Sequence, residues 1–237
     1  MSETTEAEHN LRSVANQPSE TAMATATLRA LAAHDSREEI RGSDYLAEIF
    51  LTEDRQAPLT NPAKRQWVLQ NKIAPGAYEF MIARTAFFDH LFREALVKNL
   101  PQVVFLGAGY DTRPYRFKEF VRGTRILELD APPTQLRKQE VLEKNAVKIP
   151  DGLMFIPVDF SHDNLKEILL AARFCTNEPA LFVWEGVTYY LSSDTVDETL
   201  SAVRELSTTG GSICFDYASL LPETLSQEGA RKMREHL

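Results

Sequence analysis

The second half of the chain alternates strand-length apolar runs with helical patterns, and this alternation constrains the fold more than any other feature. The five apolar runs are QVVFL (102–106), RILEL (125–129), LMFIPV (153–158), ALFVW (180–184) and SICFDY (212–217). The helical patterns between them lie around residues 114–121, 132–146, 162–173 and 194–206. Alternation of this kind is typical of a mostly parallel sheet with crossover helices on both faces. The sequence therefore predicts an α/β core over residues 101–237.

The first hundred residues show no strand pattern. Residues 1–20 are polar and acidic, and we expect them to form a disordered tail. Residues 21–100 are expected to form a helical cap that ends in one long helix, AYEFMIARTAFFDHLFREALVKNL. In that helix an apolar stripe repeats every three to four residues: Phe80, Ala83, Phe87, Leu91 and Ala95, widened by Phe88, Phe92 and Leu96. Residues 21–237 are predicted to form a single domain.

Composition narrows the class of protein. The 237 residues carry a formal net charge of −8 without any run rich in Lys and Arg, which argues against a nucleic-acid-binding surface. No apolar run approaches the roughly 18 residues that a membrane span needs, and the N-terminus shows no secretory leader. Cys175 and Cys214 lie in apolar stretches and favour buried thiols in a reducing compartment. A soluble, cytoplasmic protein is expected.

Distinctive residues follow the apolar runs at the point where each predicted strand ends. Ligands of such sheets bind at the carboxyl ends of the strands, near the switch in strand order. The residues in these positions are Gly107 and Gly109 after the first run, Asp130 after the second, Asp159 and Phe160 after the third, and Glu185 after the fourth. The sequence therefore predicts one ligand site built from these strand ends.

The first two strand ends indicate a nucleoside. The glycine turn lets the backbone approach a ligand closely, and Asp130, 23 residues after Gly107, can accept hydrogen bonds from both ribose hydroxyls. Enzymes that use NAD and enzymes that use S-adenosylmethionine (SAM) share these two features. A dinucleotide site needs a third glycine, however, and Thr112-Arg113-Pro114 stands in its place. SAM carries no phosphate, so this change does not disfavour it.

The later strand ends are less specific. Asp159 suits a contact to the exocyclic amine of adenine, and Glu185 would face the methionine part of the ligand. Structural roles remain open, because Asp159 or Ser161 could cap the following helix and Asp130 precedes a helix start with Pro at its first position. The histidines show no metal-ligand spacing, so no metal is predicted. His90 is expected to be solvated, and no nucleophile elbow or Walker loop is present.

Five segments together resemble a known family. They are ARTAFFDHLF, QVVFLGAGYDTRPYRF, ILELDAP, FIPVDFS and VWEGVTYYL, in this order between residues 21 and 217. They are similar to the leucine carboxyl methyltransferase-like family of SAM-dependent methyltransferases, whose bacterial branch consists largely of provisionally assigned O-methyltransferases. The resemblance implies the Rossmann-like class I SAM-dependent methyltransferase fold and SAM as cofactor.

The resemblance also implies roles for individual residues. Arg84 would hold the methionine carboxylate, and a guanidinium suits that task because it can pair a carboxylate bidentately. Gly107 would line the methionyl chain and Asp130 would bind the ribose. Asp159 and Phe160 would contact adenine, and Glu185 the methionine end. Without the resemblance, Arg84 would be interpreted as a snorkelling residue on a helix flank.

The function expected from this set is O-methyl transfer to a carboxylate or another oxygen of a small molecule or peptide. A carboxylate acceptor needs no base, and no catalytic residue is assigned, although Tyr189 and Tyr190 could line the acceptor pocket. Family members continue past the fifth strand into a closing strand pair, so the C-terminal strands are expected to be missing. The uncovered strand edge leaves association into a homo-oligomer open. A non-catalytic, regulatory SAM-binding protein and an NAD(P)-dependent oxidoreductase are the alternatives, the latter disfavoured by Thr112.

Overall fold

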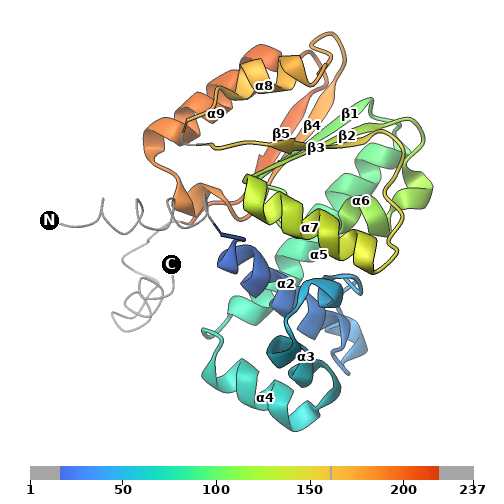
Figure 1. The fold of residues 1–237 in the computed structure, drawn as a ribbon, viewed down its shortest axis with the longest axis vertical. Coiled ribbons are helices and arrows are strands. Elements are labelled where there is room, and N and C mark those ends of the chain that lie inside the picture. Colours follow the sequence, from blue (N-terminus) through green and yellow to red (C-terminus); the bar gives the residue numbers. More distant parts are fainter. Residues whose placement is uncertain (1–16, 161, 219–237) are drawn as a thin grey trace, which may run out of the picture.

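Five parallel strands form the sheet at the centre of the protein (Figure 1). The computed structural model describes residues 17–160 and 162–218. The strands are β1 (Gln102–Leu106), β2 (Arg125–Asp130), β3 (Leu153–Pro157), β4 (Ala180–Trp184) and β5 (Ser212–Phe215), in the spatial order β3-β2-β1-β4-β5. All four neighbouring pairs are parallel. The predicted Rossmann-like α/β fold with a mostly parallel sheet is confirmed, and the strand order reverses between β1 and β4.

Helices cover both faces of the sheet, as crossover connections require. They are α5 (Ala77–Val97), α6 (Arg113–Arg116), η3 (Lys118–Phe120), α7 (Pro132–Lys144), α8 (Leu165–Ala171), η4 (Thr188–Tyr190) and α9 (Ser193–Leu206). Successive strand residues point to opposite faces. Val104 and Leu106 of β1 therefore pack in the core shared with α8 and α9. Val103 and Phe105 pack instead in the core shared with α5.

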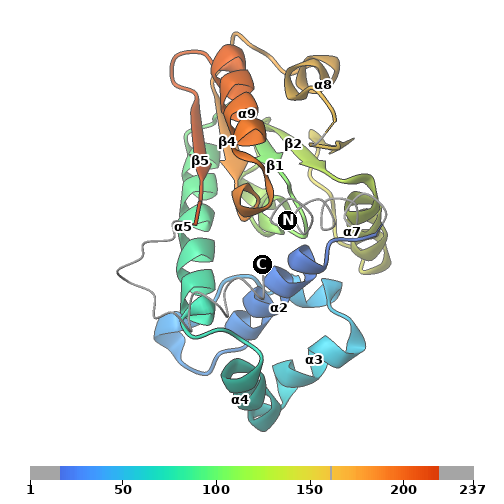
Figure 2. The same cartoon turned by 90° about the vertical axis from the view of Figure 1, so that its left-hand side faces the viewer.

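The N-terminal helices form a further layer beyond one end of the sheet, visible in both ribbon views (Figures 1 and 2). They are α2 (Glu20–Ala33), η1 (Glu38–Ile40), η2 (Ala47–Phe50), α3 (Glu53–Thr60) and α4 (Pro62–Asn71). Phe50 lies at the centre of this layer, where its ring stacks on Tyr110 at 4.9 Å between ring centroids. Ser19 caps α2 by accepting a hydrogen bond from the Ala22 amide, although residues up to 20 were expected to be disordered.

The predicted apolar stripe of α5 was wrong at three positions, because Phe80, Ala83 and Phe87 are all exposed. Phe80 and Phe87 are 53% and 57% exposed, whereas Phe88 and Phe92 are buried. Asp89 lies on the buried face as well, since its carboxylate pairs with two arginines of the sheet side. The helix is therefore rotated by about one residue relative to the expected stripe, because burying Asp89 with its partners requires that orientation.

Some of the sequence-based predictions concern residues that the structure does not describe. Residues 1–16, position 161 and the last part of the predicted α/β core, residues 219–237, belong to that group. Within the described ranges, Cys175 and Cys214 are free and half-buried. A search of the described helices finds none that is both long and apolar enough to cross a membrane.

Candidate functional site

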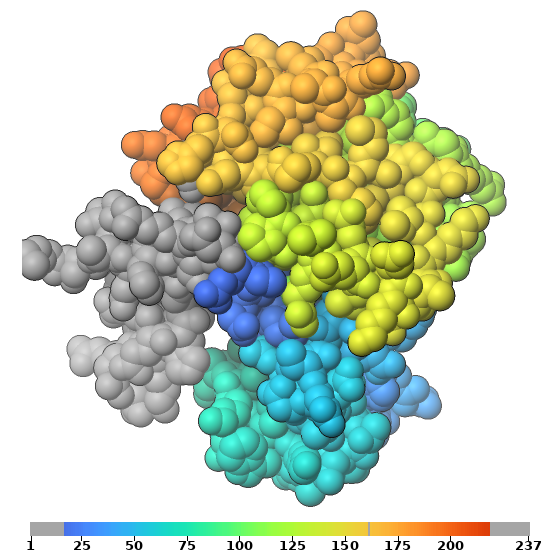
Figure 3. All heavy atoms as spheres, viewed as in Figure 1, coloured from blue at the N-terminus to red at the C-terminus, as the bar shows by residue number. Residues whose placement is uncertain are grey.

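A cavity of about 300 Å³ lies at the carboxyl ends of the strands, beneath α2. All seven predicted site residues line it: Arg84, Gly107, Gly109, Asp130, Asp159, Phe160 and Glu185. Thr21, Ala22 and Thr25 of α2 close it from the side of the helical layer. The start of α2 is tied to α7, since the Ser19 amide donates to Thr134 Oγ1 at 2.9 Å, and the two segments adjoin on the surface (Figure 3). The cavity has the size of a small-molecule site.

The turn after β1 can be made only with glycine at its first position. Gly107 has a φ of +76°, and a Cβ there would lie 2.5 Å from Cγ2 of Val187. A Cβ on Gly109 would lie 3.3 Å from the Cβ of Ala22 in α2. The turn therefore packs closely between the loop after β4 and helix α2. Because it carries no side chains at these positions, its backbone lines the cavity directly.

The amides of this turn are already occupied. The amides of Gly107 and Ala108 donate to the Leu129 carbonyl at 2.9 and 2.8 Å. The Gly109 amide donates to Asp130 Oδ2 at 2.5 Å. The helix that follows, α6, has only four residues and so offers a short N-terminus. A pyrophosphate would need free amides and a helix N-terminus at this place, so the turn is unsuited to a dinucleotide.

Asp130 ends β2 beside the glycine turn, and its side chain is largely buried. Its second oxygen, Oδ1, accepts from the Ala131 amide at 2.7 Å. Burial raises the pKa of the Asp130 carboxyl, and the hydrogen bonds from the two backbone amides act in the opposite direction. Each carboxylate oxygen can accept a further hydrogen bond. Asp130 can therefore receive two hydroxyl groups while the backbone fixes its position.

Asp159 and Phe160 follow β3, the strand next to β2, and also line the cavity. The capping alternative for this segment was wrong, because α8 begins at Leu165 and its N-cap is Asn164, whose side chain accepts from the Glu167 amide. The Asp159 amide donates instead to Asp163 at 2.8 Å, which shapes the loop. Ser161, the other capping candidate, lies outside the described residues.

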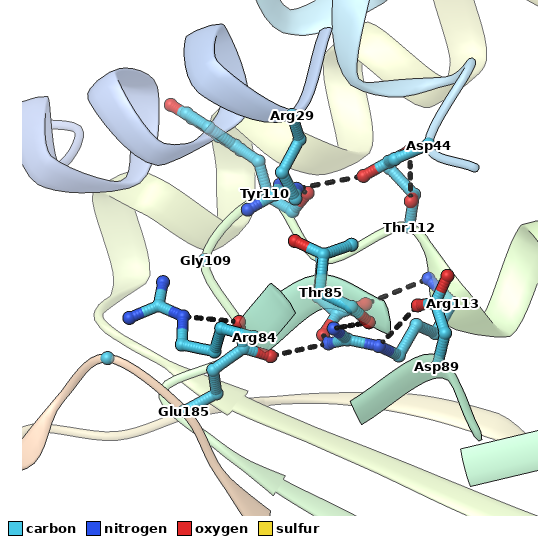
Figure 4. A network of polar contacts seen from close by, with 12 residues as sticks. Arg29, Asp44, Arg84, Thr85, Asp89, Gly109, Tyr110, Thr112, Arg113 and Glu185 are labelled. Atoms are coloured by element: carbon cyan, nitrogen blue, oxygen red, sulfur yellow. Dashed lines mark hydrogen bonds and ion pairs between the residues drawn. The ribbon is translucent and has the colours of Figure 1, made fainter. Parts of the chain in front are cut away.

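Arg84 lies between two carboxylates. Its Nε is 2.9 Å from Glu185 Oε1, an ion pair without hydrogen-bond geometry. Its Nη1 donates to Asp216 Oδ2 at 2.9 Å. In the described part of the chain, Nη2 has only the Met81 sulfur as a partner, at 3.5 Å. Figure 4 shows the terminal nitrogens turned away from Glu185. Arg84 is thus held by two acids and keeps one donor for a ligand.

The Asp-Thr-Arg sequence after the glycine turn, residues 111–113, forms buried polar contacts with other elements of the site. Arg113 is buried and pairs with Asp89 at 2.8 Å, Asp111 at 2.5 Å and Glu185 at 2.7 Å. Figure 4 shows it between Asp89 and Glu185, opposite Arg84. Thr112 is also buried. Arg113 therefore fixes Glu185 from the side away from Arg84.

Sequence reasoning missed two parts of this arrangement. Asp44, in the loop between η1 and η2, accepts from Thr112 Oγ1 at 2.6 Å and Arg29 Nε at 2.8 Å, and no local pattern marked it. Asp216 follows β5, and the rule that found Asp130 and Glu185 would have found it too. It was counted within the fifth apolar run instead.

Acidic side chains outnumber basic side chains along the cavity. The charged lining residues are the carboxylates Asp111, Asp130, Asp159 and Glu185 and the guanidiniums Arg29 and Arg84. This excess favours a ligand with positive charge. In the described ranges no group of three or more His, Cys, Asp or Glu side chains is placed to hold a metal ion.

Comparison with known proteins identifies the family. A model of the leucine carboxyl methyltransferase family matches residues 22–204. The chain belongs to this family. A Bacillus subtilis (strain 168) relative, provisionally named a SAM-dependent methyltransferase, is 31% identical over 173 residues, which are 73% of this chain and 54% of that protein. A Parafrankia relative with the same provisional name is 31% identical over 209 residues, covering 88% of this chain and 66% of that protein.

The chain thus spans about half to two thirds of the length of these two family members. A solved structure has a fold similar to that of this chain. It is a provisionally assigned methyltransferase from Thermobifida fusca YX, with a TM-score of 0.55 and 19% identity. The alignment covers 93% of this chain and 74% of that one.

Proposed function

We propose that the cavity binds SAM and that the protein is a SAM-dependent methyltransferase. The observation that carries the proposal is the convergence of seven residues, predicted from separate segments, on one cavity. The excess of acids supports it, because SAM bears a net positive charge through its sulfonium and ammonium groups. The occupied amides of the glycine turn also support it over a dinucleotide.

The proposed contacts follow from the geometry. Arg84 would bind the ligand carboxylate through its remaining donor Nη2, and Glu185 would attract the ammonium group. Asp130 would accept both ribose hydroxyls. Asp159 and Phe160 would contact adenine by hydrogen bonding and by packing. Gly107 and Gly109 would let the ligand approach the backbone closely.

The reaction we propose is O-methyl transfer to a carboxylate or other oxygen acceptor, on a small molecule or a peptide. A lone pair of the acceptor oxygen attacks the methyl carbon, the carbon–sulfur bond breaks, and its electrons return to sulfur to give S-adenosylhomocysteine. An ionised carboxylate needs no base for this step. Holding the acceptor in line with the departing sulfur can contribute roughly 7–11 kcal/mol. The free thiols of Cys175 and Cys214 fit a cytoplasmic location, which we also propose.

Isothermal titration with SAM, S-adenosylhomocysteine and NAD tests the cofactor. We expect the first two to bind and NAD not to bind. Asp130→Asn should weaken SAM binding by about 1.5–3 kcal/mol, because hydrogen bonds to a charged group are lost. Asp197→Asn, on the exposed face of α9, is the matched control and should bind normally. A folded protein that binds NAD but not SAM would refute the proposal.

A labelled methyl donor tests the acceptor class. Incubation with candidate carboxylic acids should give a labelled methyl ester, which alkali hydrolyses to labelled methanol. A labelled product that resists alkali would instead indicate transfer to a hydroxyl group. SAM binding without transfer to any acceptor would favour the non-catalytic alternative.

A further inference from the structure

Asp216, at the carboxyl end of β5, accepts hydrogen bonds from several elements at once. Its Oδ2 accepts from Arg84 Nη1 at 2.9 Å and from the Tyr189 hydroxyl. Its Oδ1 accepts from the Gly186 amide at 2.6 Å, and its carbonyl accepts from Thr188 Oγ1 at 2.6 Å. One residue after β5 therefore holds both the arginine on α5 and the turn after β4.

The turn and the arginine are also in direct contact. A Cβ on Gly186 would lie 3.3 Å from both terminal nitrogens of Arg84, so the glycine backbone packs against the guanidinium. Because Asp216 fixes the Gly186 amide and Nη1 together, the plane of the guanidinium has little freedom to rotate. Glu185 restrains Nε from a different direction, at 2.9 Å. Nη2 is then the guanidinium nitrogen without a carboxylate partner among the described residues.

The consequence concerns one part of the ligand only. Arg84 lies at the end of the cavity formed by α5 and the loop after β4, whereas Asp130 and Asp159 follow β2 and β3. A change in the orientation of Arg84 should therefore alter recognition of an amino-acid carboxylate and leave recognition of the nucleoside intact.

We propose that Asp216 is a positioning residue for the amino-acid part of the ligand, acting through Arg84. The inference rests on the proposed SAM site and deepens it. Through Asp216, β5 would contribute to ligand binding, although the strand itself contains none of the seven predicted site residues.

Two ligands separate this role from a general structural one. S-adenosylhomocysteine carries the amino-acid group, and methylthioadenosine carries the same nucleoside without it. In isothermal titration, Asp216→Asn should weaken S-adenosylhomocysteine at least about tenfold, as expected when a hydrogen bond from a charged group is misdirected. The same variant should bind methylthioadenosine as the unchanged protein does. Asp197→Asn should bind both ligands normally.

A double-mutant cycle tests whether Asp216 acts through Arg84. In an Arg84→Met background, Asp216→Asn should cause no further loss of S-adenosylhomocysteine affinity. Asp216→Glu keeps the charge but displaces the carboxylate by one methylene, so it should also weaken S-adenosylhomocysteine selectively, and it serves if Asp216→Asn does not fold.

Three results would overturn the inference. Unchanged S-adenosylhomocysteine affinity in both Asp216 variants would remove the positioning role. Equal losses for the two ligands would show that Asp216 acts on the stability of the whole site. If the unchanged protein binds neither ligand, the proposed SAM site itself fails and the inference fails with it.

Discussion

Gly107 combines two constraints that can be separated experimentally. Its φ of +76° disfavours any other residue, and Val187 occupies the space that a Cβ would need. Gly123 has a similar φ of +86°, but a Cβ there would meet nothing within 4 Å. Both glycines therefore have a left-handed backbone, but only Gly107 is also packed against a neighbouring side chain.

Gly107→Ala should destabilise the protein more than Gly123→Ala. The left-handed backbone costs about 1–2 kcal/mol in either variant, and the clash with Val187 adds about 1–3 kcal/mol at Gly107. Urea unfolding should show this difference in the free energy of unfolding. Equal losses in the two variants would mean that the turn is not packed as described.

The residues at strand ends were predictable because parallel strands bring their carboxyl ends to one edge of the sheet. Asp130 and Glu185 therefore lie where the sequence placed them. The exposure of Phe87 was not predictable, because two neighbouring stripes of α5 are both apolar. The choice between them depends on Asp89, whose arginine partners come from a distant segment.

At the scale of elements, α7 is fixed to β2 by a buried ion pair. Lys138 Nζ lies 2.7 Å from Glu128 Oε2, and the Tyr115 hydroxyl of α6 also donates to this carboxylate. Burial raises the pKa of Glu128 to about 7, and Lys138 opposes that shift. The unfolded chain releases this proton near pH 4.5, so the group makes stability fall as the pH rises from about 4.5 to 7.

Lys138→Met should destabilise the protein by about 3–5 kcal/mol at pH 8, because it leaves a buried charge without its partner. The loss should be smaller at pH 5.5, where Glu128 takes up a proton in the folded state. Chemical unfolding at both pH values measures the difference. Glu128→Gln/Lys138→Met is the control, and its own free energy of unfolding should carry no pH dependence from this pair. A loss in Lys138→Met that is the same at both pH values would contradict this description.

The strands were more predictable than the N-terminal helices. The three central strands β2, β1 and β4 are buried and appear as continuous apolar runs. The edge strands β3 and β5 are partly exposed but still carry apolar runs of strand length, so all five were found. The helices α3 and α4 carry few buried residues, and Pro58 lies inside α3. Their stretch therefore resembles a proline-containing loop in the sequence, whereas in the structure α3 packs against α2 and α4 packs against α3.

At the scale of the whole molecule, charged side chains join the helical layer to the sheet. Arg29 of α2 donates to Asp44 at 2.8 Å and to the Tyr110 carbonyl at 2.7 Å. Asp44 is bonded in turn to Thr112 beside α6. These contacts hold α2 over the glycine turn, so the roof and the floor of the cavity are parts of one connected network. That connection agrees with the predicted single domain, which stays a prediction.

A crystal structure of the protein with S-adenosylhomocysteine would test directly whether this cavity is a SAM site, as we propose. We expect the ribose hydroxyls within hydrogen-bond distance of Asp130, and the ligand carboxylate on Nη2 of Arg84. A ligand that binds outside the cavity, or whose ribose contacts neither oxygen of Asp130, would contradict this proposal.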